Sequence, residues 1–528
     1  MFRSCYYLIM AKVSVGENTQ TFIEKTHEEI MVIIFALMLA MLLSALDQTV
    51  VATALPRIAT DLHGLNKLSW VATAYLLTSA ISTPLYGKIG DQFGRKKIFQ
   101  FAIVLFLIGS ALCGISQNMD QLVAFRALQG IGAGGLMSLS MTIVGDVVSP
   151  RQRGKYLGYF GAVFAISSVA GPLLGGFFTD SLSWRWVFYI NIPLGIIALL
   201  VIASKLHLPV SRTVHKIDYL GSGLLVSSVV PIILATVWGG VTYPWGSTTI
   251  IGLYGFGVLT MLLFVLWERR AKEAILPTHL FKNDIFSVSM ILSLLAGIAL
   301  FAAILFIPEY QQIVRGYSAM KSGLFLLPLV GGMLVSLVST GRLITKYGRY
   351  RLFPILGTLV TGLGMWLFSH LTLRTSQFEL SVWMVVLGLG IGMFMQVMTL
   401  AVQNAVDHSE IGVATSSATF FRSIGSSLGG AIFGAILTNH LAFHLKQLLP
   451  AASTKPIAGL ATSIQNGISS VDIRQMSPSI SHAIFQAFVL SFHDMFILGI
   501  PVIALAFVAA LFLRETPLRT TVKQPEII

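Results

Sequence analysis

The chain has 528 residues, of which 55% are hydrophobic and only 11% are charged, and its formal net charge is +13. Soluble globular proteins carry about 25% charged residues, so this composition excludes a soluble enzyme, a disordered protein and a secreted disulfide scaffold. Two cysteines are too few for a disulfide framework or a four-cysteine zinc site, and the chain has no phosphate-binding loop for ATP hydrolysis.

Fourteen segments are long and apolar enough to cross a bilayer as helices, since a span needs about 20 mostly apolar residues. In chain order they cover residues 30–53, 68–88, 97–117, 119–145, 154–178, 185–204, 218–238, 249–267, 286–308, 321–341, 351–371, 380–402, 411–438 and 495–514. The short alternating segments of an outer-membrane barrel are absent. We therefore predict an all-α integral membrane protein. The 29 residues before the first span make a poor secretory signal, and Met1 and Met10 are alternative starts.

Lysine and arginine are distributed unevenly between the two sets of connections. If the N-terminus is cytoplasmic, 24 of the 35 Lys and Arg residues fall in cytoplasmic segments and nine fall outside. Positively charged loops stay on the cytoplasmic side of a membrane. We expect both termini in the cytoplasm of a multi-pass protein of the cell membrane. The positive charge is explained by this topology, so we expect no nucleic-acid partner.

Two loops show an internal repeat. The loop 87–97 reads GKIGDQFGRKK and the loop 341–351 reads GRLITKYGRYR, so both begin with glycine and carry Gly-Arg seven residues later. Because they follow the second and tenth predicted helices, the chain divides into six helices, two inserted helices and six more. Such duplicated bundles enclose the solute site of many transporters. The expected parts are a cytoplasmic tail (1–29), a six-helix bundle (30–206), two linker helices with cytoplasmic flanks (207–284), a second six-helix bundle (285–514) and a cytoplasmic tail (515–528).

The second bundle contains the one long connection, the extracellular loop 439–494. It carries four histidines, His440, His444, His482 and His493, among apolar residues. We expect amphipathic pieces that rest on the outer membrane surface, with solvated histidines. A pH-sensing role for these histidines is the alternative interpretation.

One carboxylate lies well inside a predicted span. Asp47 is about nine residues, or ~13 Å, from the outer end of the first span, and Arg126 is ~10 Å from the outer end of the fourth. Ionisable groups at such depth are usually paired or functional. We predict that Asp47 accepts a proton from outside and that Arg126 modulates it. The alternative is a static ion pair that joins the two helices.

Five motifs give the chain a close resemblance to the fourteen-helix drug:proton antiporter family of the major facilitator superfamily. They are LDQTVVATALP (46–56), GKIGDQFGRKK (87–97), RALQGIG (126–132), GPLLGG (171–176) and WRWVFYINIPLG (184–195). The resemblance extends from about residue 30 to residue 514. It implies the major facilitator fold and secondary active export of lipophilic compounds in exchange for protons, without catalysis, cofactor or metal.

The loop 87–97 is predicted to act in gating, through Gly87, Asp91, Gly94 and Arg95. Glycines permit a sharp turn, and Asp91 can accept hydrogen bonds from a helix start or pair with basic neighbours, which would lock one arrangement of the two halves. The alternative, a solvated charge run, suits the lysines that end this loop. Thr345 occupies the position of Asp91 in the second repeat, so we expect only one copy of the lock to function.

The fifth predicted helix carries a stripe of small residues that ends at Gly171, Pro172, Gly175 and Gly176. Close helix packing alone explains such glycines, and the proline permits a bend. The family resemblance adds that this bend seals the cavity against proton leak. The chain has Ser167 where many relatives have a further glycine.

Seven polar or aromatic residues are candidates for the wall of a central cavity: Tyr75, Gln129, Trp383, Gln396, Gln403, Asn404 and Arg422. Helices 10 and 13 lack the extra acids of some multidrug members. With Asp47 ionised, the two deep arginines give a net charge of +1 if both face the cavity. We therefore expect neutral or monovalent lipophilic solutes to be exported well and rigid dications poorly.

The predicted function is proton-coupled antiport of lipophilic compounds or drugs by alternating access, with antibiotic resistance as its consequence. The expected partners are a small lipophilic solute, protons and membrane lipids, and the chain is expected to work as a monomer. One alternative is a dedicated exporter of a single lipid, metabolite or amino-acid-like solute. Another is a membrane sensor without transport, which the joint presence of Asp47, Asp91 and Arg126 disfavours.

Overall fold

A computed structural model describes residues 27–63, 67–206, 217–240, 243–449, 473 and 476–518. The predicted tails (1–29 and 515–528) and the middle of the segment 439–494 lie largely outside these residues. The described part is helical, and its single β-bridge joins Gly239 to Tyr243. The helices are α2 (His27–Asp61), α3 (Leu68–Phe93), α4 (Arg95–Ile115), α5 (Met119–Val147), α6 (Pro150–Ser181), α7 (Trp186–Tyr189), α8 (Asn191–Lys205), α9 (Tyr219–Trp238), α10 (Thr248–Glu268), η2 (Leu280–Lys282), α11 (Asp284–Ile313), α12 (Ala319–Leu324), α13 (Leu327–Tyr347), α14 (Leu352–Phe368), α15 (Gln377–Ala405), η3 (His408–Glu410), α16 (Ile411–Leu448) and α19 (Pro478–Leu511).

Twelve stretches of helix in the described residues are long and apolar enough to cross a membrane. Each of the fourteen predicted segments falls on one helix or on two successive helices. The two that are not among the twelve are α3, whose 26 residues include several Ser, Thr and Gly, and α14, which has only 17 residues. The chain is therefore a multi-pass membrane protein.

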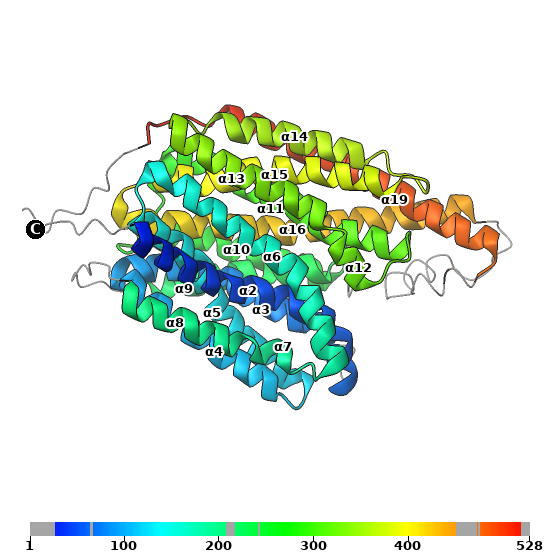
Figure 1. Cartoon of the computed structure of the whole chain (residues 1–528), viewed down its shortest axis with the longest axis horizontal. Coiled ribbons are helices and arrows are strands. Elements are labelled where there is room, and N and C mark those ends of the chain that lie inside the picture. The colour runs from blue at the N-terminus through cyan, green and yellow to red at the C-terminus, as the bar shows by residue number, and fades with distance from the viewer. Residues whose placement is uncertain are drawn as a thin grey trace, which may run out of the picture.

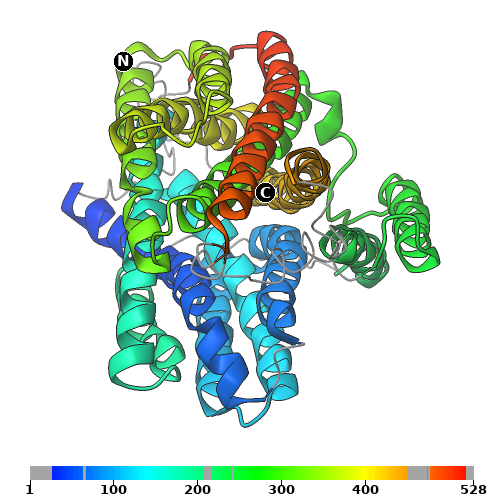
Figure 2. The same cartoon turned by 90° about the vertical axis from the view of Figure 1, so that its right-hand side faces the viewer.

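The helices form two groups and a lateral pair. In the first group α2 packs on α6, and α5 packs on α3 and α4; in the second group α11 packs on α16, and α15 packs on α13 and α14. Figures 1 and 2 show these groups as the blue-to-cyan half and the green-to-red half of the molecule. The pair α9 and α10 stands to one side, where α9 contacts α3 and α16.

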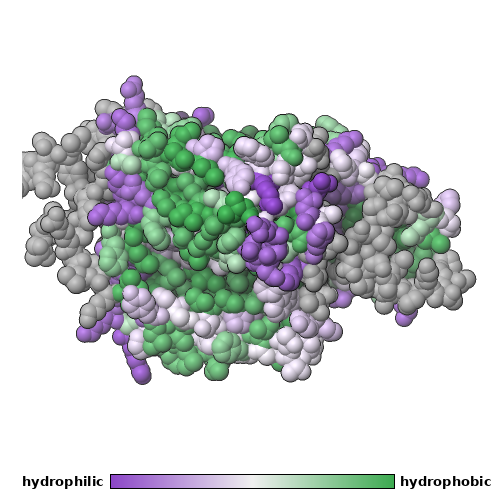
Figure 3. Space-filling model, turned by 90° about the horizontal axis from the view of Figure 1, so that it is seen from below, coloured by the Kyte–Doolittle hydropathy of each residue, from purple (hydrophilic) through white to green (hydrophobic). Residues whose placement is uncertain are grey.

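The surface of the molecule is apolar where lipid would surround it. Large side chains such as Phe101, Leu200, Leu259 and Leu359 are at least half exposed on four different helices. Figure 3 shows a broad hydrophobic face bordered by hydrophilic side chains near the end where the described residues begin (His27) and end (Leu518), here called the termini end. A water-soluble protein seldom exposes so large an apolar area, whereas acyl chains solvate it without penalty.

The segment 439–494 differs from the prediction of surface-lying pieces. The helix α16 continues to Leu448 and α19 already begins at Pro478, so His440 and His444 lie on α16, and His482 and His493 lie on α19. The reason is a shared apolar seam. Leu437, Leu441 and Leu445, spaced one turn apart on α16, join the same buried cluster as Ala483, Ile484 and Ala487 on α19. Both helices therefore extend as a packed pair beyond the rest of the bundle (Figure 1).

Candidate functional site

Asp47 and Arg126 form a buried ion pair between α2 and α5. Each residue is 1% exposed, and Nη1 of Arg126 donates to Oδ2 of Asp47. The Gln129 amide bridges the two, since its Oε1 accepts from Arg126 Nη1 at 2.8 Å and its Nε2 donates to Asp47 Oδ1 at 2.8 Å. Asn191 of α8 donates to the same Oδ1 at 3.1 Å. The carboxylate is stable away from water because its charge is paired and both oxygens accept hydrogen bonds.

The guanidinium of Arg126 is also held by α3. Its Nε donates to the carbonyl oxygen of Val71 at 3.3 Å, and its Cζ lies 4.1 Å from the centre of the Tyr75 ring. The Tyr75 hydroxyl is 2.9 Å from Ser44 Oγ on α2. One polar cluster thus joins α2, α3, α5 and α8. Asp47 is therefore linked to all four helices, directly or through Arg126.

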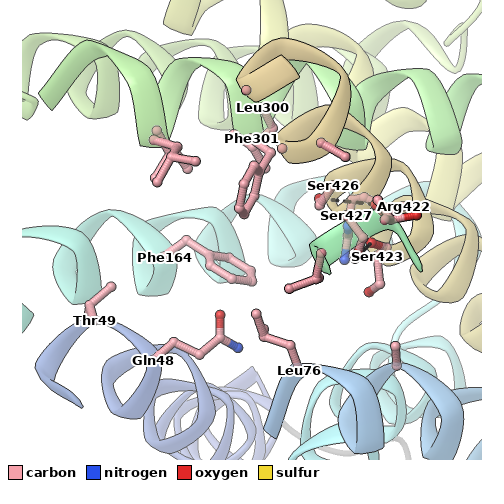
Figure 4. A pocket seen from close by; sticks show the side chains of 18 of the residues that line it. Gln48, Thr49, Leu76, Phe164, Leu300, Phe301, Arg422, Ser423, Ser426 and Ser427 are labelled. Atoms are coloured by element: carbon pink, nitrogen blue, oxygen red, sulfur yellow. Dashed lines mark hydrogen bonds between the residues drawn. The ribbon is translucent and has the colours of Figure 1, made fainter. Parts of the chain in front are cut away.

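A cavity of about 550 Å³ lies beside this cluster, between the two helix groups. This volume is within the usual range for drug-sized ligands, roughly 300–1,000 Å³. Gln48 and Thr49, which directly follow Asp47 on α2, are on the wall of the cavity, whereas Asp47 is not (Figure 4). The wall reaches Trp245 and Asn439 at the end remote from the termini. Solute in this cavity would therefore contact the same helix that carries the buried carboxylate.

One of the seven predicted cavity residues lines the cavity in the described arrangement. Arg422 lines the cavity, but the other six candidates do not; they are Tyr75, Gln129, Trp383, Gln396, Gln403 and Asn404. Tyr75 and Gln129 belong to the ion-pair cluster, where Arg126 needs them as partners. Trp383 packs against Phe368, and Asn404 Nδ2 donates to Thr516 Oγ1 at 2.9 Å.

Gln396 and Gln403 join the two halves on the termini side of the cavity. Gln396 Nε2 donates to the carbonyl oxygen of Gly154 at 2.5 Å, and Gln403 Nε2 donates to that of Met141 at 3.1 Å. These bonds connect α15 with α5 and α6. The two halves are therefore in contact on the termini side of the cavity and separated around the cavity itself.

Asp91, in the last turn of α3, joins that helix to the start of α16. Its Oδ1 and Oδ2 accept hydrogen bonds from the backbone N–H groups of Gly412, at 3.2 Å, and Val413, at 2.9 Å. Unpaired N–H groups and the helix dipole make a helix start a favourable site for a carboxylate. Arg95 donates to Asp91 Oδ1 at 2.7 Å and pairs with Asp146. Asp91 therefore holds the two halves together at the termini end.

Both copies of the repeat bring two helices into close contact at this end. A Cβ on Gly87 would overlap with the Ser416 side chain of α16, and a Cβ on Gly341 would overlap with the Gly154 carbonyl of α6. The turn glycines Gly94 and Gly348 have φ of 94° and 72°, which only glycine adopts easily. The pairs α3–α16 and α13–α6 are thus equivalent contacts.

The second copy has no carboxylate at its contact. Thr345, at the position of Asp91, donates its hydroxyl hydrogen to Gly341 of its own helix at 2.9 Å. Across the contact, Arg151 Nε donates to the backbone carbonyl of Thr345 at 3.2 Å. The two contacts are therefore chemically different, with a buried charge in the first and backbone acceptors in the second.

The small-residue stripe on α6 packs against two different helices. Cβ atoms on Gly171 and Gly175 would overlap with Thr49 and Thr53 of α2, within the first half. A Cβ on Gly176 would meet nothing within 4 Å. Pro172 faces the other half, where a Cβ on Gly323 would lie 3.2 Å from its ring. The segment 171–176 thus lies where α2 and the second half meet α6.

Two partners of the predicted site were not among the sequence candidates. Asn191 completes the Asp47 cluster and stands in the motif at 184–195, so its position in a motif was an available signal. Asp146 pairs with Arg95, but nothing in the pattern of α5 distinguishes it. Both become visible only when helices distant in sequence pack together.

A third cluster lies on α16 and α19, remote from the termini. Nδ1 of His440 and Nε2 of His444 each lie 2.7 Å from Oδ2 of Asp494. Among the described residues, these three side chains place metal-binding atoms close enough together for an ion. Two of the four histidines expected to be solvated in a loop, His440 and His444, therefore share a carboxylate between two helices.

Two groups of apolar helices around a central cavity, with an apolar outer surface, are the arrangement of a multi-pass membrane transporter. The chain belongs to the Major Facilitator Superfamily, whose family model matches residues 37–430.

Proteins that are similar to this chain extend over most of its length. An uncharacterized MFS-type transporter of Mycobacterium tuberculosis (strain ATCC 25618 / H37Rv) is 40% identical over 92% of this chain and 70% of its own length. Multidrug transporter protein MdtP of Bacillus subtilis (strain 168) is 37% identical over 94% of both chains. The solved structure of the proton:xylose symporter XylE shares the fold, with a TM-score of 0.58 at 15% identity over 90% of this chain and 95% of that one.

Proposed function

We propose that this transporter is a proton-coupled exporter that moves lipophilic compounds out of the cell by alternating access. The observation that carries the proposal is a buried carboxylate, Asp47, on the same helix as three residues of a mostly apolar cavity, Ala45, Gln48 and Thr49. Apolar walls bind lipophilic solutes through the area they bury. The name of the relative MdtP, a multidrug transporter, supports solutes of this class.

Coupling follows from the hydrogen bonds around Asp47. The ionised carboxylate satisfies Arg126, Gln129 and Asn191 together. A proton on Asp47 removes the charge that balances Arg126, so the cluster has to rearrange. Since Gln48 and Thr49 follow Asp47 on α2, the rearrangement reaches the solute through one helix. Binding of a proton and binding of a solute then oppose each other, as antiport requires.

Gating is assigned to the contacts at the termini end. With the termini in the cytoplasm, as the lysine and arginine distribution predicts, the described arrangement faces outward. Release of Asp91 from the start of α16 would open the cytoplasmic end. The segment 171–176 of α6, packed on α2 and facing the second half, would keep the outer path sealed in that state. One chain contains both halves and the cavity, so we propose a functional monomer.

The test is transport by purified protein in liposomes with an imposed pH gradient and a lipophilic fluorescent solute. Wild type should accumulate the solute against its gradient. Asp47→Asn should fail to do so while still binding the solute. The matched control is Asp61→Asn, a partly exposed carboxylate farther along α2, which should transport normally. Accumulation by Asp47→Asn at the wild-type rate would exclude Asp47 as the proton carrier, and a panel of solutes would separate broad from single-solute export.

A further inference from the structure

The wall of the cavity carries a single charge among the described residues, and that charge is positive. Arg422 is the only ionisable residue on the wall. Asp47 is 1% exposed and paired with Arg126 behind the wall. Glu309, one turn beyond Leu305 on α11, is not part of the wall either. A solute in the cavity therefore meets one guanidinium and no carboxylate.

Arg422 has no partner of its own in the described part of the chain. No hydrogen bond or ion pair involves its guanidinium, whereas Arg126 has several of both. The adjacent serines are not partners of the guanidinium. The hydroxyls of Ser423, Ser426 and Ser427 donate to carbonyl oxygens of their own helix. An arginine without a counter-charge inside a membrane protein is costly, and a bound anion would remove that cost.

The helices α16 and α11 are in close contact at Arg422. A Cβ on Gly297 of α11 would overlap with the Arg422 carbonyl oxygen, so the two helices touch at this point. Ser426 Oγ, one turn later, lies 3.4 Å from the Gly297 carbonyl. The side chain extends into the cavity beside the serines (Figure 4).

The rest of the cavity is suited to an apolar body. Phe164 of α6 and Phe301 of α11 point into it from opposite sides (Figure 4). Leu76 and Leu300 also line the cavity. The volume of about 550 Å³ accommodates a drug-sized molecule. The site therefore combines one positive group with an extended apolar surface.

We propose that the cavity selects amphiphilic monoanions, that is, solutes with one carboxylate or a similar group on an apolar body. This inference rests on the proposed export function and names its solute class. The guanidinium can bind a carboxylate through two parallel charge-assisted hydrogen bonds. A cation would add a second positive charge without any acid to balance it. The sequence predicts a net cavity charge of +1 from Asp47 and both deep arginines. In the structure Asp47 neutralises Arg126 behind the wall, and Arg422 alone faces the solute.

The test uses three fluorescent solutes with one apolar body, ending in a carboxylate, its methyl ester or a trimethylammonium group. Wild-type protein in liposomes with a pH gradient should move the carboxylate with at least about tenfold higher kcat/KM than the cation. Equal transport of all three would overturn the selectivity while leaving export intact. Transport of none would contradict the proposed export itself.

Substitutions at one position then separate charge from fold. Arg422→Gln should lose the preference for the carboxylate, Arg422→Glu should reverse it toward the cation, and Arg422→Lys should keep it. The control is Arg374→Gln, an exposed arginine outside the cavity. Equilibrium binding of the carboxylate to detergent-purified protein gives a second readout without a gradient, and Arg422→Gln should weaken it about tenfold. An unchanged preference in Arg422→Glu would overturn the proposal.

Discussion

Asp47 shows how one charged side chain is kept in the apolar interior of this transporter. Arg126 balances its charge, and Gln129 and Asn191 bond its oxygen atoms. Removal of one member of a buried ion pair leaves an isolated charge, which costs more than removal of both. The stability of the protein is therefore expected to depend on the pair, whereas the proposed proton coupling depends on the carboxylate.

This difference can be measured with a double substitution. Arg126→Gln alone should lower the free energy of unfolding by about 3–5 kcal/mol, because Asp47 loses its counter-charge. The double variant Asp47→Asn/Arg126→Gln should recover much of that loss. Unfolding temperatures of the wild type, both single variants and the double variant in detergent check it. Losses that simply add would contradict the pairing.

Gly87 tests the close contact between α3 and α16. A methyl group at this position would overlap with Ser416, so Gly87→Ala should separate the two helices and cost about 1–3 kcal/mol. The same substitution at Gly176, which has free space around it, is the control. Distances between spin labels on α3 and α16 at the termini end should lengthen in Gly87→Ala only. An unchanged distance would show that the contact tolerates a side chain.

The candidate site could be predicted from the sequence only where a residue departs from its surroundings. Asp47 and Arg126 stand out as charges within apolar spans, and the structure brings them together. Gln396 and Gln403 stand out equally, but they join the two halves instead of lining the cavity. The difference depends on which face of α15 meets the first half. No pattern within one helix encodes that contact.

At the scale of elements, the two repeats make equivalent helix contacts with unequal chemistry. Asp91 contributes a buried carboxylate to the contact of α3 with α16, whereas Thr345 contributes only a backbone acceptor to the contact of α13 with α6. Hydrogen bonds to a charged group contribute about 1.5–3 kcal/mol each. The first contact is therefore expected to control closure of the termini end.

The matched variants are Asp91→Asn and Thr345→Ala. Asp91→Asn should shift the population toward the state that is open at the termini end by about tenfold or more, since about 1.4 kcal/mol corresponds to a factor of ten. Thr345→Ala should have little effect because its hydroxyl bonds its own helix. Modification rates of single cysteines on the two sides of the cavity report the shift. Equal effects of both substitutions would contradict the asymmetry.

The helices themselves could be predicted because long apolar segments have few alternatives in a membrane. The ends of the helices could not be predicted in the same way. Polar residues such as His440, His444 and Lys446 interrupt the apolar run on α16, yet the helix continues to Leu448 because its leucines pack on α19. Tertiary packing thus extends both helices beyond the point where hydropathy falls.

At the scale of the whole molecule, the number of spans and the side of each loop decide how the two halves can move. The short helix α14 is the critical case, because it is not among the twelve apolar spans. Lys346 and Arg374 lie on either side of it and are both exposed. If α14 crosses the membrane, as the fourteen-helix topology predicts, the two residues face opposite compartments.

Labelling of intact cells tests this topology. In a Cys5→Ser background, where the remaining Cys113 is buried, a membrane-impermeant maleimide should react with Arg374→Cys and not with Lys346→Cys. Permeabilised cells should show both reactions, which controls for accessibility. Reaction of both cysteines in intact cells would show that α14 does not cross and that the predicted topology is wrong.

The proposed antiport requires that protons and solute move in opposite directions through one cavity and one carboxylate. The most direct measurement follows the pH inside liposomes with a trapped dye while a solute gradient, without any imposed pH gradient, drives transport. Wild type should move protons against the direction of solute flow, and Asp47→Asn should move none. Solute-driven transport without any pH change in the wild type, or an equal pH change in Asp47→Asn, would contradict the account.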